Sequence, residues 1–250
     1  MKKWQVTIFI ILAGIIVIGI ISFFVIRSLT KDTIEKTEGE IKGEVESCLA
    51  NSIKDAVFFN PLQGGYFLTP EPKVKFDYLE IPIYWDKGTK KVPDITELEK
   101  QIGIAIQVSI SDCVGDFEEV RERGYDVEIG DIEKVNVYIK DKLIEADVFW
   151  SITIKKGDGV KEFSKFSNSL EFDFMKYWKI VLEGVRLQES LPNDIPIVEF
   201  SKLAYDNKFQ FETIEMGDNT VVYNFKFDND LVPKIKYIYA FASRYISKEV

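Results

Sequence analysis

The hydrophobic positions are densest near the N-terminus. No charged residue occurs between Trp4 and Ile26, and the apolar core of this stretch is the segment Val6–Ile26. At about 1.5 Å per residue, a helix of that length spans roughly 30 Å, which is the hydrocarbon thickness of a bilayer. Because backbone polar groups in lipid must be hydrogen-bonded within the segment, we predict a transmembrane helix over residues 6–26, after a short basic tail of residues 1–5.

The charges that flank this segment predict its orientation. Two lysines and the terminal amine precede it, whereas Arg27 and Lys31 follow it among acidic residues. The positive-inside rule then places the N-terminus in the cytoplasm. The segment is longer than the apolar region of a secretory signal peptide and has no small-residue cleavage site, so we expect it to remain as an anchor. Residues 27–250 are therefore expected to form the extracytoplasmic domain of a single-pass cell-membrane protein.

Beyond the predicted anchor, the spacing of apolar residues predicts three helices. Apolar or small residues recur with a period of about 3.6 over residues 32–59, which predicts a membrane-proximal helix. Asp94, followed three residues later by Glu97, is a capping pattern that opens a second helix, whose apolar face extends to Cys113. A third apolar stripe predicts a helix over residues 174–188.

Alternation of apolar and polar residues predicts strands in the intervening stretches. Residues 73–85 are expected to be extended, with Pro82 placing this strand at a sheet edge or ending it. Further strands are predicted over residues 135–139, 144–154, 163–172, 209–214, 221–227 and 235–242. Strands and helices mixed in this way predict an α+β domain with a mainly antiparallel sheet and packed helices.

The composition narrows the chemistry that this domain could perform. The chain has 32 basic and 41 acidic residues and no histidine. Its net charge of -9 repels nucleic-acid phosphates, so we expect no nucleic-acid partner. The absence of histidine removes the commonest general base and metal ligand, and two cysteines are too few for a zinc site of the Cys/His type. We therefore expect a protein without enzymatic activity and without a cofactor.

The two cysteines, Cys48 and Cys113, each fall on the apolar face of a predicted helix. If those helices pack together, the sulfurs could form a disulfide, and closing so long a loop would stabilise the fold by about 4 kcal/mol in the chain-entropy model. The other interpretation is a pair of buried thiols that act as small hydrophobic residues. We favour the disulfide, which suits a domain in an oxidising compartment.

Other short motifs have structural interpretations. Gly64-Gly65 lacks the neighbouring residues of a phosphate-binding loop, so we predict a turn that ends the membrane-proximal helix. Asp228-Asn229-Asp230 has oxygen ligands suited to calcium, but the run does not continue with EF-hand spacing, and we predict a solvent-exposed turn.

Two further sets of residues could serve catalysis or binding. The acid pairs Glu97/Glu99 and Glu118/Glu119 could supply the acid and base of a hydrolase, although chance pairs are expected among so many acidic residues. Aromatic residues are plentiful and most should lie in the core. The set expected to be most exposed is that of the last predicted strand, namely Tyr237, Tyr239, Phe241 and Tyr245.

The N-terminus resembles that of archaeal type IV pilin-like proteins. It has a short basic leader, then Gln5, Thr7 two residues later and a long apolar helix, with Trp4 in place of the usual glycine and Phe9 in place of the usual acid. More broadly, the chain resembles uncharacterised archaeal single-span membrane proteins. The residues that carry this second resemblance are Cys48, Gly64-Gly65-Tyr66 and Cys113. The resemblance implies a surface protein and brings no known activity with it.

These observations lead to three hypotheses of function. The first is a membrane-anchored module of the cell envelope, held in the bilayer through Val6–Ile26, that acts by contact with other proteins not identified by the sequence. The alternative is a type IV pilin-like subunit or pilus accessory protein, for which a leader would be cleaved before Gln5. The third is a hydrolase that uses a pair of carboxylates.

Overall fold

The computed structural model describes residues 18, 20, 21 and 36–246. The predicted transmembrane helix over residues 6–26 lies almost entirely outside this part of the chain, and so does the predicted tail of residues 1–5. Within it, Ile18, Ile20 and Ile21 are helical and exposed. Over the described residues, no helix is both long enough and apolar enough to cross a membrane.

A helix over residues 36–59 begins the described domain. We call it the N-terminal helix. The elements that follow are η1 (Asn60–Gln63), β1 (Lys73–Phe76), β2 (Leu79–Asp86), β3 (Thr89–Lys90), α2 (Ile95–Val114), α3 (Glu118–Glu122), β4 (Asp126–Lys140), β5 (Leu143–Lys156), β6 (Gly159–Phe163), β7 (Phe166–Glu171), α4 (Phe174–Ser190), α5 (Ile197–Asn207), β8 (Gln210–Glu215), β9 (Thr220–Phe227) and β10 (Tyr237–Arg244). The predicted α+β architecture is confirmed for this part of the chain.

The described strands form two sheets. In the first, which we call the proximal sheet, β5 pairs antiparallel with β4 on one side and with both β6 and β7 on the other. In the second, the distal sheet, the order is β1-β2-β10-β9-β8, with β3 also paired to β2. All of these pairings are antiparallel except that of β2 with β10, so the prediction of a mainly antiparallel sheet holds.

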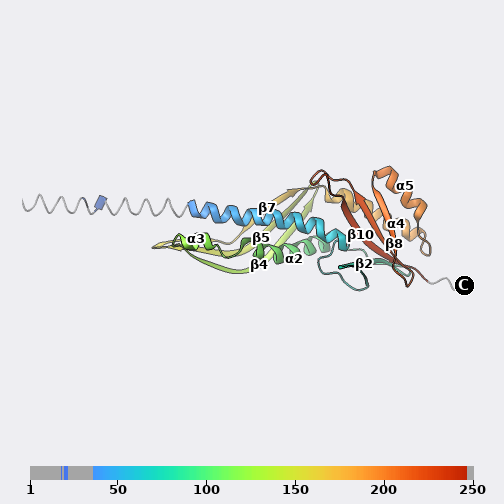
Figure 1. Ribbon diagram of the computed structural model, residues 1–250, viewed down its shortest axis with the longest axis horizontal. Helices are drawn as coiled ribbons and strands as arrows, with labels where there is room; N and C mark the ends of the chain where they lie inside the picture. The colour runs from blue at the N-terminus through green and yellow to red at the C-terminus, as the bar shows by residue number, and fades with distance from the viewer. Residues whose placement is uncertain (1–17, 19, 22–35, 247–250) are drawn as a thin grey trace, which may run out of the picture.

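The proximal sheet is covered on one face by the N-terminal helix and α2, which run alongside it in Figure 1. Every second residue of β5, from Ile144 to Ile154, is buried against this helix pair. The helices contribute apolar side chains such as Leu49 and Ile106, neither of which is exposed. Alternation along β5 therefore places one face in the core and leaves the other half-exposed, as the sequence predicts.

The strand predicted over residues 163–172 matches β7, whereas β6 precedes it and shares only Phe163 with the predicted range. β6 and β7 pair with different halves of β5, and the ladder is interrupted where Ser164 accepts a hydrogen bond from the backbone N–H of Trp150. A second difference concerns Pro82, which lies inside β2 rather than at an edge or an end. It is the last residue of β2 paired with β1, and the next residue, Ile83, is the first paired with β10. Pro82 therefore stands where the β1–β2 ladder ends and the β2–β10 ladder begins, a position where a missing backbone N–H can be tolerated.

The distal sheet packs one face against α4 and α5. The ring of Trp178 on α4 lies 5.5 Å from that of Tyr239, and the ring of Phe200 on α5 lies 5.5 Å from that of Phe225. The C-terminal aromatic set that we expected to be exposed is therefore buried, because β10 is an inner strand and its aromatic face meets these helices. The exposed fractions are 0% for Tyr237 and Tyr239, 1% for Phe241 and 6% for Tyr245.

Helix α5 is not predicted by the apolar pattern. Phe200 and Ala204 are its only buried residues, so its apolar stripe is too narrow to stand out in the sequence. The helix begins directly after Pro196 and ends at Lys208, whose φ of 54° is left-handed. Because α5 directly precedes β8, the chain enters the distal sheet from a helix rather than from a long loop.

Candidate functional site

The two cysteines form a disulfide. Cys48 of the N-terminal helix is bonded to Cys113 of α2, with 5.7 Å between the Cα atoms. Cys48 is buried, with an exposed fraction of 6%, whereas Cys113 is exposed and lies beside the buried face of α2 rather than on it. We expected Cys113 to lie on the apolar face of α2, but the buried residue at this point of the helix is its neighbour Val114. The bond joins two packed helices, and its Cys113 end lies at the surface of the domain.

Gly64 and Gly65 form the turn after η1, with φ values of 61° and 80°. Their backbone N–H groups donate to the carbonyls of Pro61 and Asn60 at 3.2 and 2.8 Å. Because both donors are used within the turn, neither is free to hold a phosphate. The carbonyl of Gly64 instead accepts a hydrogen bond of 2.5 Å from the hydroxyl of Tyr84. The glycine pair is thus a packed structural turn between the N-terminal helix and the distal sheet.

Buried tyrosines surround this turn. The hydroxyls of Tyr84 and Tyr239 lie 2.9 Å apart, and burial raises the pKa of each well above that of a free tyrosine. Burial, with Glu97 and Asp94 nearby, raises the pKa of Tyr66 to about 12. These hydroxyls stay protonated near neutral pH, so they act as hydrogen-bonding groups of the core and not as acids or bases.

The acid pair Glu97/Glu99 has structural partners, whereas Glu118 and Glu119 are exposed in the first turn of α3. An Oε atom of Glu99 accepts the backbone N–H of Ile139 at 2.8 Å, and an Oε atom of Glu97 accepts from the amide of Gln101 at 2.8 Å. The other end of the Gln101 amide accepts the backbone N–H groups of the loop residues 67 and 68. Gln101 is buried, and its role as a loop anchor has no signal in the sequence beyond a polar residue on an apolar helix face.

The run Asp228-Asn229-Asp230 is organised around its central residue. Asn229 is buried, donates to the carbonyl of Ile235 at 2.7 Å and accepts the backbone N–H of Val232 at 2.7 Å. Its amide is therefore used to hold the loop before β10 and is not directed outward as a ligand. Over the part of the chain that the structure describes, no three Asp, Glu, His or Cys side chains gather closely enough to hold a metal ion.

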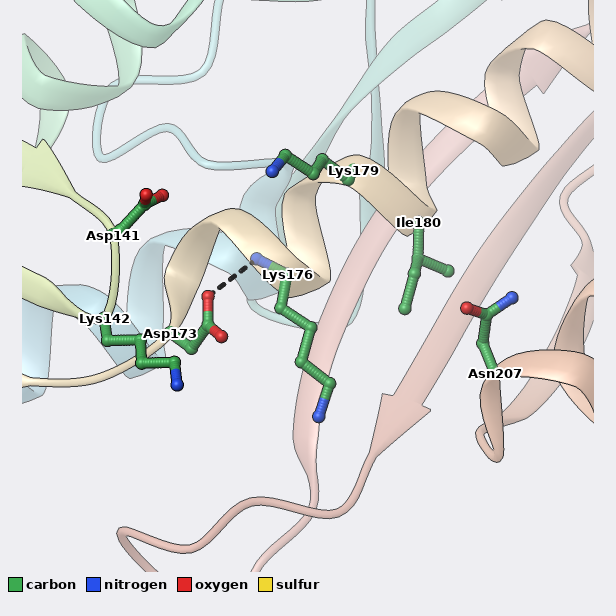
Figure 2. Close-up of a pocket in the computed structure, with 7 residues that line it drawn as sticks. All are labelled: Asp141, Lys142, Asp173, Lys176, Lys179, Ile180 and Asn207. Atoms are coloured by element: carbon green, nitrogen blue, oxygen red, sulfur yellow. Dashed lines mark hydrogen bonds between the residues drawn. The ribbon is translucent and has the colours of Figure 1, made fainter.

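The main candidate site is a pocket of about 480 Å³ between the two sheets, shown in Figure 2. It is lined by Asp141 and Lys142 from the β4–β5 turn, by Asp173, Lys176, Lys179 and Ile180 from the start of α4, and by Asn207 from the end of α5. None of these described lining residues carries a hydroxyl or a thiol. The pocket brings together three segments that are far apart in the sequence, which is why no local motif marks it.

The electrostatics of this pocket are mixed. Asp173 is the N-cap of α4 and accepts the backbone N–H of Lys176 at 3.1 Å, so its carboxylate already serves the helix. In Figure 2 the side chains of Lys142 and Lys176 extend in the same direction on either side of Asp173. The same two lysines also line a second hollow of about 660 Å³, together with Asp230 and Leu231 from the loop before β10. The surface presents ammonium groups and carboxylates side by side, and its described lining contains no paired nucleophile and base.

No protein-family model matches this chain, and neither a curated protein nor a solved structure does. The function of the protein is therefore inferred from its own residues and contacts.

Proposed function

We propose that this protein is anchored in the cell membrane by residues 6–26 and holds its α+β domain outside the cytoplasm, where it acts by contact with other proteins. The observation that carries the proposal is the disulfide between Cys48 and Cys113. Structural disulfides persist in oxidising compartments and are rare in the cytosol. Since Cys113 is exposed, cytosolic reductants would reach this bond. An uncharged segment long enough to span a bilayer supplies the means of anchoring.

The arrangement of the domain supports a contact role. The N-terminal helix and α3 lie toward one end of the elongated domain, whereas β8, α4 and α5 lie toward the other end (Figure 1). Apolar side chains are exposed at that far end, including Val198 and Tyr205 on α5, with exposed fractions of 77% and 85%. Exposed apolar residues far from an anchor are well placed to meet a partner.

A pilin-like subunit or pilus accessory protein is the second candidate. It is favoured by the firm attachment of the N-terminal helix to the proximal sheet, which a filament subunit would need. Lys161 of β6 forms an ion pair of 2.8 Å with Glu38, and Asn168 of β7 donates to the carbonyl of Glu46 at 2.7 Å. The two candidates differ at the N-terminus. Mass spectrometry of the mature protein would find Met1 in an anchored module and Gln5 as the first residue in a processed pilin-like subunit.

Thiol labelling of intact cells tests the location of the domain. A membrane-impermeant maleimide should label the protein only after treatment with a reductant, because both thiols are held in an extracytoplasmic disulfide. The matched control is the double variant Cys48→Ser/Cys113→Ser, which should stay unlabelled. A second control adds Lys3→Cys to that variant, and this cytoplasmic thiol should react only after lysis. Labelling of the native protein that needs cell lysis, or that needs no reductant, would overturn the proposal.

A further inference from the structure

Helices contact both edges of the proximal sheet at particular residues. Along β4, the backbone N–H of Ile139 is taken by Glu99 of α2, and Gly103 of α2 lies so close that a Cβ there would be 3.4 Å from the carbonyl oxygen of Val135. Along β7, the side chain of Asn168 donates to the carbonyl of Glu46 in the N-terminal helix at 2.7 Å. Covering or capping an edge in this way prevents pairing with another chain.

Among the described residues, no second strand pairs with the outer edge of β8. This strand is the last in the order β1-β2-β10-β9-β8, and its pairing partner is β9. Gln210, Glu212, Thr213 and Glu215 are exposed, and Phe211 and Ile214 are half-buried. Exposed residues occur on both faces of the strand, so neither face is fully covered at this edge.

The hydrogen-bond register shows which backbone groups of β8 face outward. Met216 donates its N–H to the carbonyl of Thr220 at 2.9 Å, and Tyr245 donates its N–H to the carbonyl of Asn219 at 2.9 Å. In an antiparallel ladder the bonded positions alternate, so the even-numbered residues of β9 bond to β8 and the odd-numbered residues bond to β10. The backbone N–H and C=O groups of residues 211, 213 and 215 therefore point away from the sheet.

The surroundings of this edge are acidic. A hollow of about 670 Å³ at the end of β8 is lined in part by Asp194, Glu215 and Asp218, and its described lining contains no lysine or arginine. The carboxylate of Glu212 is already paired with Lys226 of β9, so Glu215 and the hollow supply the negative charge at this edge. A segment that pairs with this edge would therefore meet carboxylates along and beyond it, which favours basic side chains.

We propose that β8 is a docking strand, which pairs by strand addition with an extended segment of a partner protein that carries lysine or arginine. The inference rests on the proposed contact function and names the surface and the partner chemistry for it. Main-chain hydrogen bonds to residues 211, 213 and 215 would supply affinity, and the acidic hollow would select basic side chains. A second copy of this chain fits less well, because β8 carries two glutamates and neither lysine nor arginine, so two β8 edges would bring two acidic strands together.

Peptide binding to the full-length protein in nanodiscs tests the docking strand. The probe is an acetylated hexapeptide that alternates lysine and valine, and the matched control has glutamate in place of lysine. We expect the lysine peptide to bind at least tenfold more tightly than the glutamate peptide. Thr213→Pro should weaken binding of the lysine peptide about tenfold or more, because it removes an outward N–H without removing a β8–β9 bond. Thr213→Ala should stay within about twofold of the native protein.

Equal binding of the two peptides, or unchanged binding by a folded Thr213→Pro variant, would overturn the proposal. If that variant does not fold, amide exchange in the native protein decides the matter. Saturation with the lysine peptide must then slow exchange at residues 213 and 215, and unchanged exchange there overturns it. Dimerisation that Thr213→Pro abolishes would also overturn it, because the edge would then belong to a second copy. Peptide binding in nanodiscs does not depend on cellular orientation, so failure here leaves the labelling result, and hence the proposed location, standing.

Discussion

Removal of the disulfide should cost a large part of the stability of this domain. Cys48 and Cys113 are separated by 65 residues, and the chain-entropy model gives about 4 kcal/mol for closing a loop of that length in the unfolded chain. Reduction of the native protein removes this constraint but leaves both sulfurs in place. The double variant Cys48→Ala/Cys113→Ala removes the constraint and also the sulfur buried at Cys48, which adds about 1 kcal/mol for lost packing.

Urea unfolding of the full-length protein in detergent, followed by circular dichroism with and without reductant, measures these differences. We expect the reduced protein to lose about 4 kcal/mol and the alanine double variant about 5 kcal/mol, with a steeper dependence on urea because the unfolded chain becomes more expanded. A loss below about 1 kcal/mol in the reduced protein would refute the reasoning, since packing of the N-terminal helix against α2 would then hold the two segments together without the bond.

The exposure of Cys113 leads to a kinetic result that can be measured in the same samples. A phosphine reductant should break the bond in the folded protein, at a rate that rises with reductant concentration. A reduction rate that instead equals the rate of global unfolding, and does not depend on reductant concentration, would show that the bond is shielded.

Two further predictions concern the distal sheet and the helices. Burial disfavours ionisation of Asp86, but hydrogen bonds from Lys91 and Arg244 outweigh it and lower the pKa of this carboxyl. The stability that it contributes is present above the unfolded pKa of about 3.9 and declines as pH falls toward the lower folded value. Asp86→Asn should therefore cost about 2 kcal/mol at pH 7 and progressively less as pH falls below about 3.9. Urea titrations at neutral and acid pH check this, and a cost that does not fall with pH would contradict it. Gly184→Ala should destabilise by about 1–3 kcal/mol, because its Cβ would lie 2.9 Å from an aromatic ring of β9. Gly43→Ala should instead stabilise the helix by about 1 kcal/mol, because alanine favours helices more than glycine does and nothing lies within 4 Å of its Cβ position. Thermal unfolding of the two variants checks both signs. A shift of the melting temperature in the same direction for both would count against this account.

Much of the secondary structure of this domain can be predicted from local pattern. Asp94 is the N-cap of α2 and accepts the backbone N–H of Glu97, as the capping pattern predicts. The apolar period over residues 36–59 and the alternation along β5 lead to the helix and the strand that the structure contains. These features depend on residues close together along the chain, so the chain pattern carries the information that decides them.

The candidate site could be predicted only in part. The turn at Gly64-Gly65 follows from residue type, and the disulfide follows from two cysteines on helices that pack together, although Cys113 lies beside the buried face of α2. The lysine-bordered pocket does not, because Lys142, Lys176 and Asn207 come from a turn and two helices that only the folded chain brings together.

The amino-acid sequence by itself determined an uncharged segment long enough to span a bilayer, an acidic chain without histidine, and the positions of most helices and strands. Only the tertiary structure decided that β10 is an inner strand, that Cys113 is exposed and that β8 is an edge strand. The physical reason is strand order, which depends on contacts between distant segments. Tyr84 and Tyr239, for example, share a hydrogen bond across 155 residues, and no periodicity within either strand specifies that they meet.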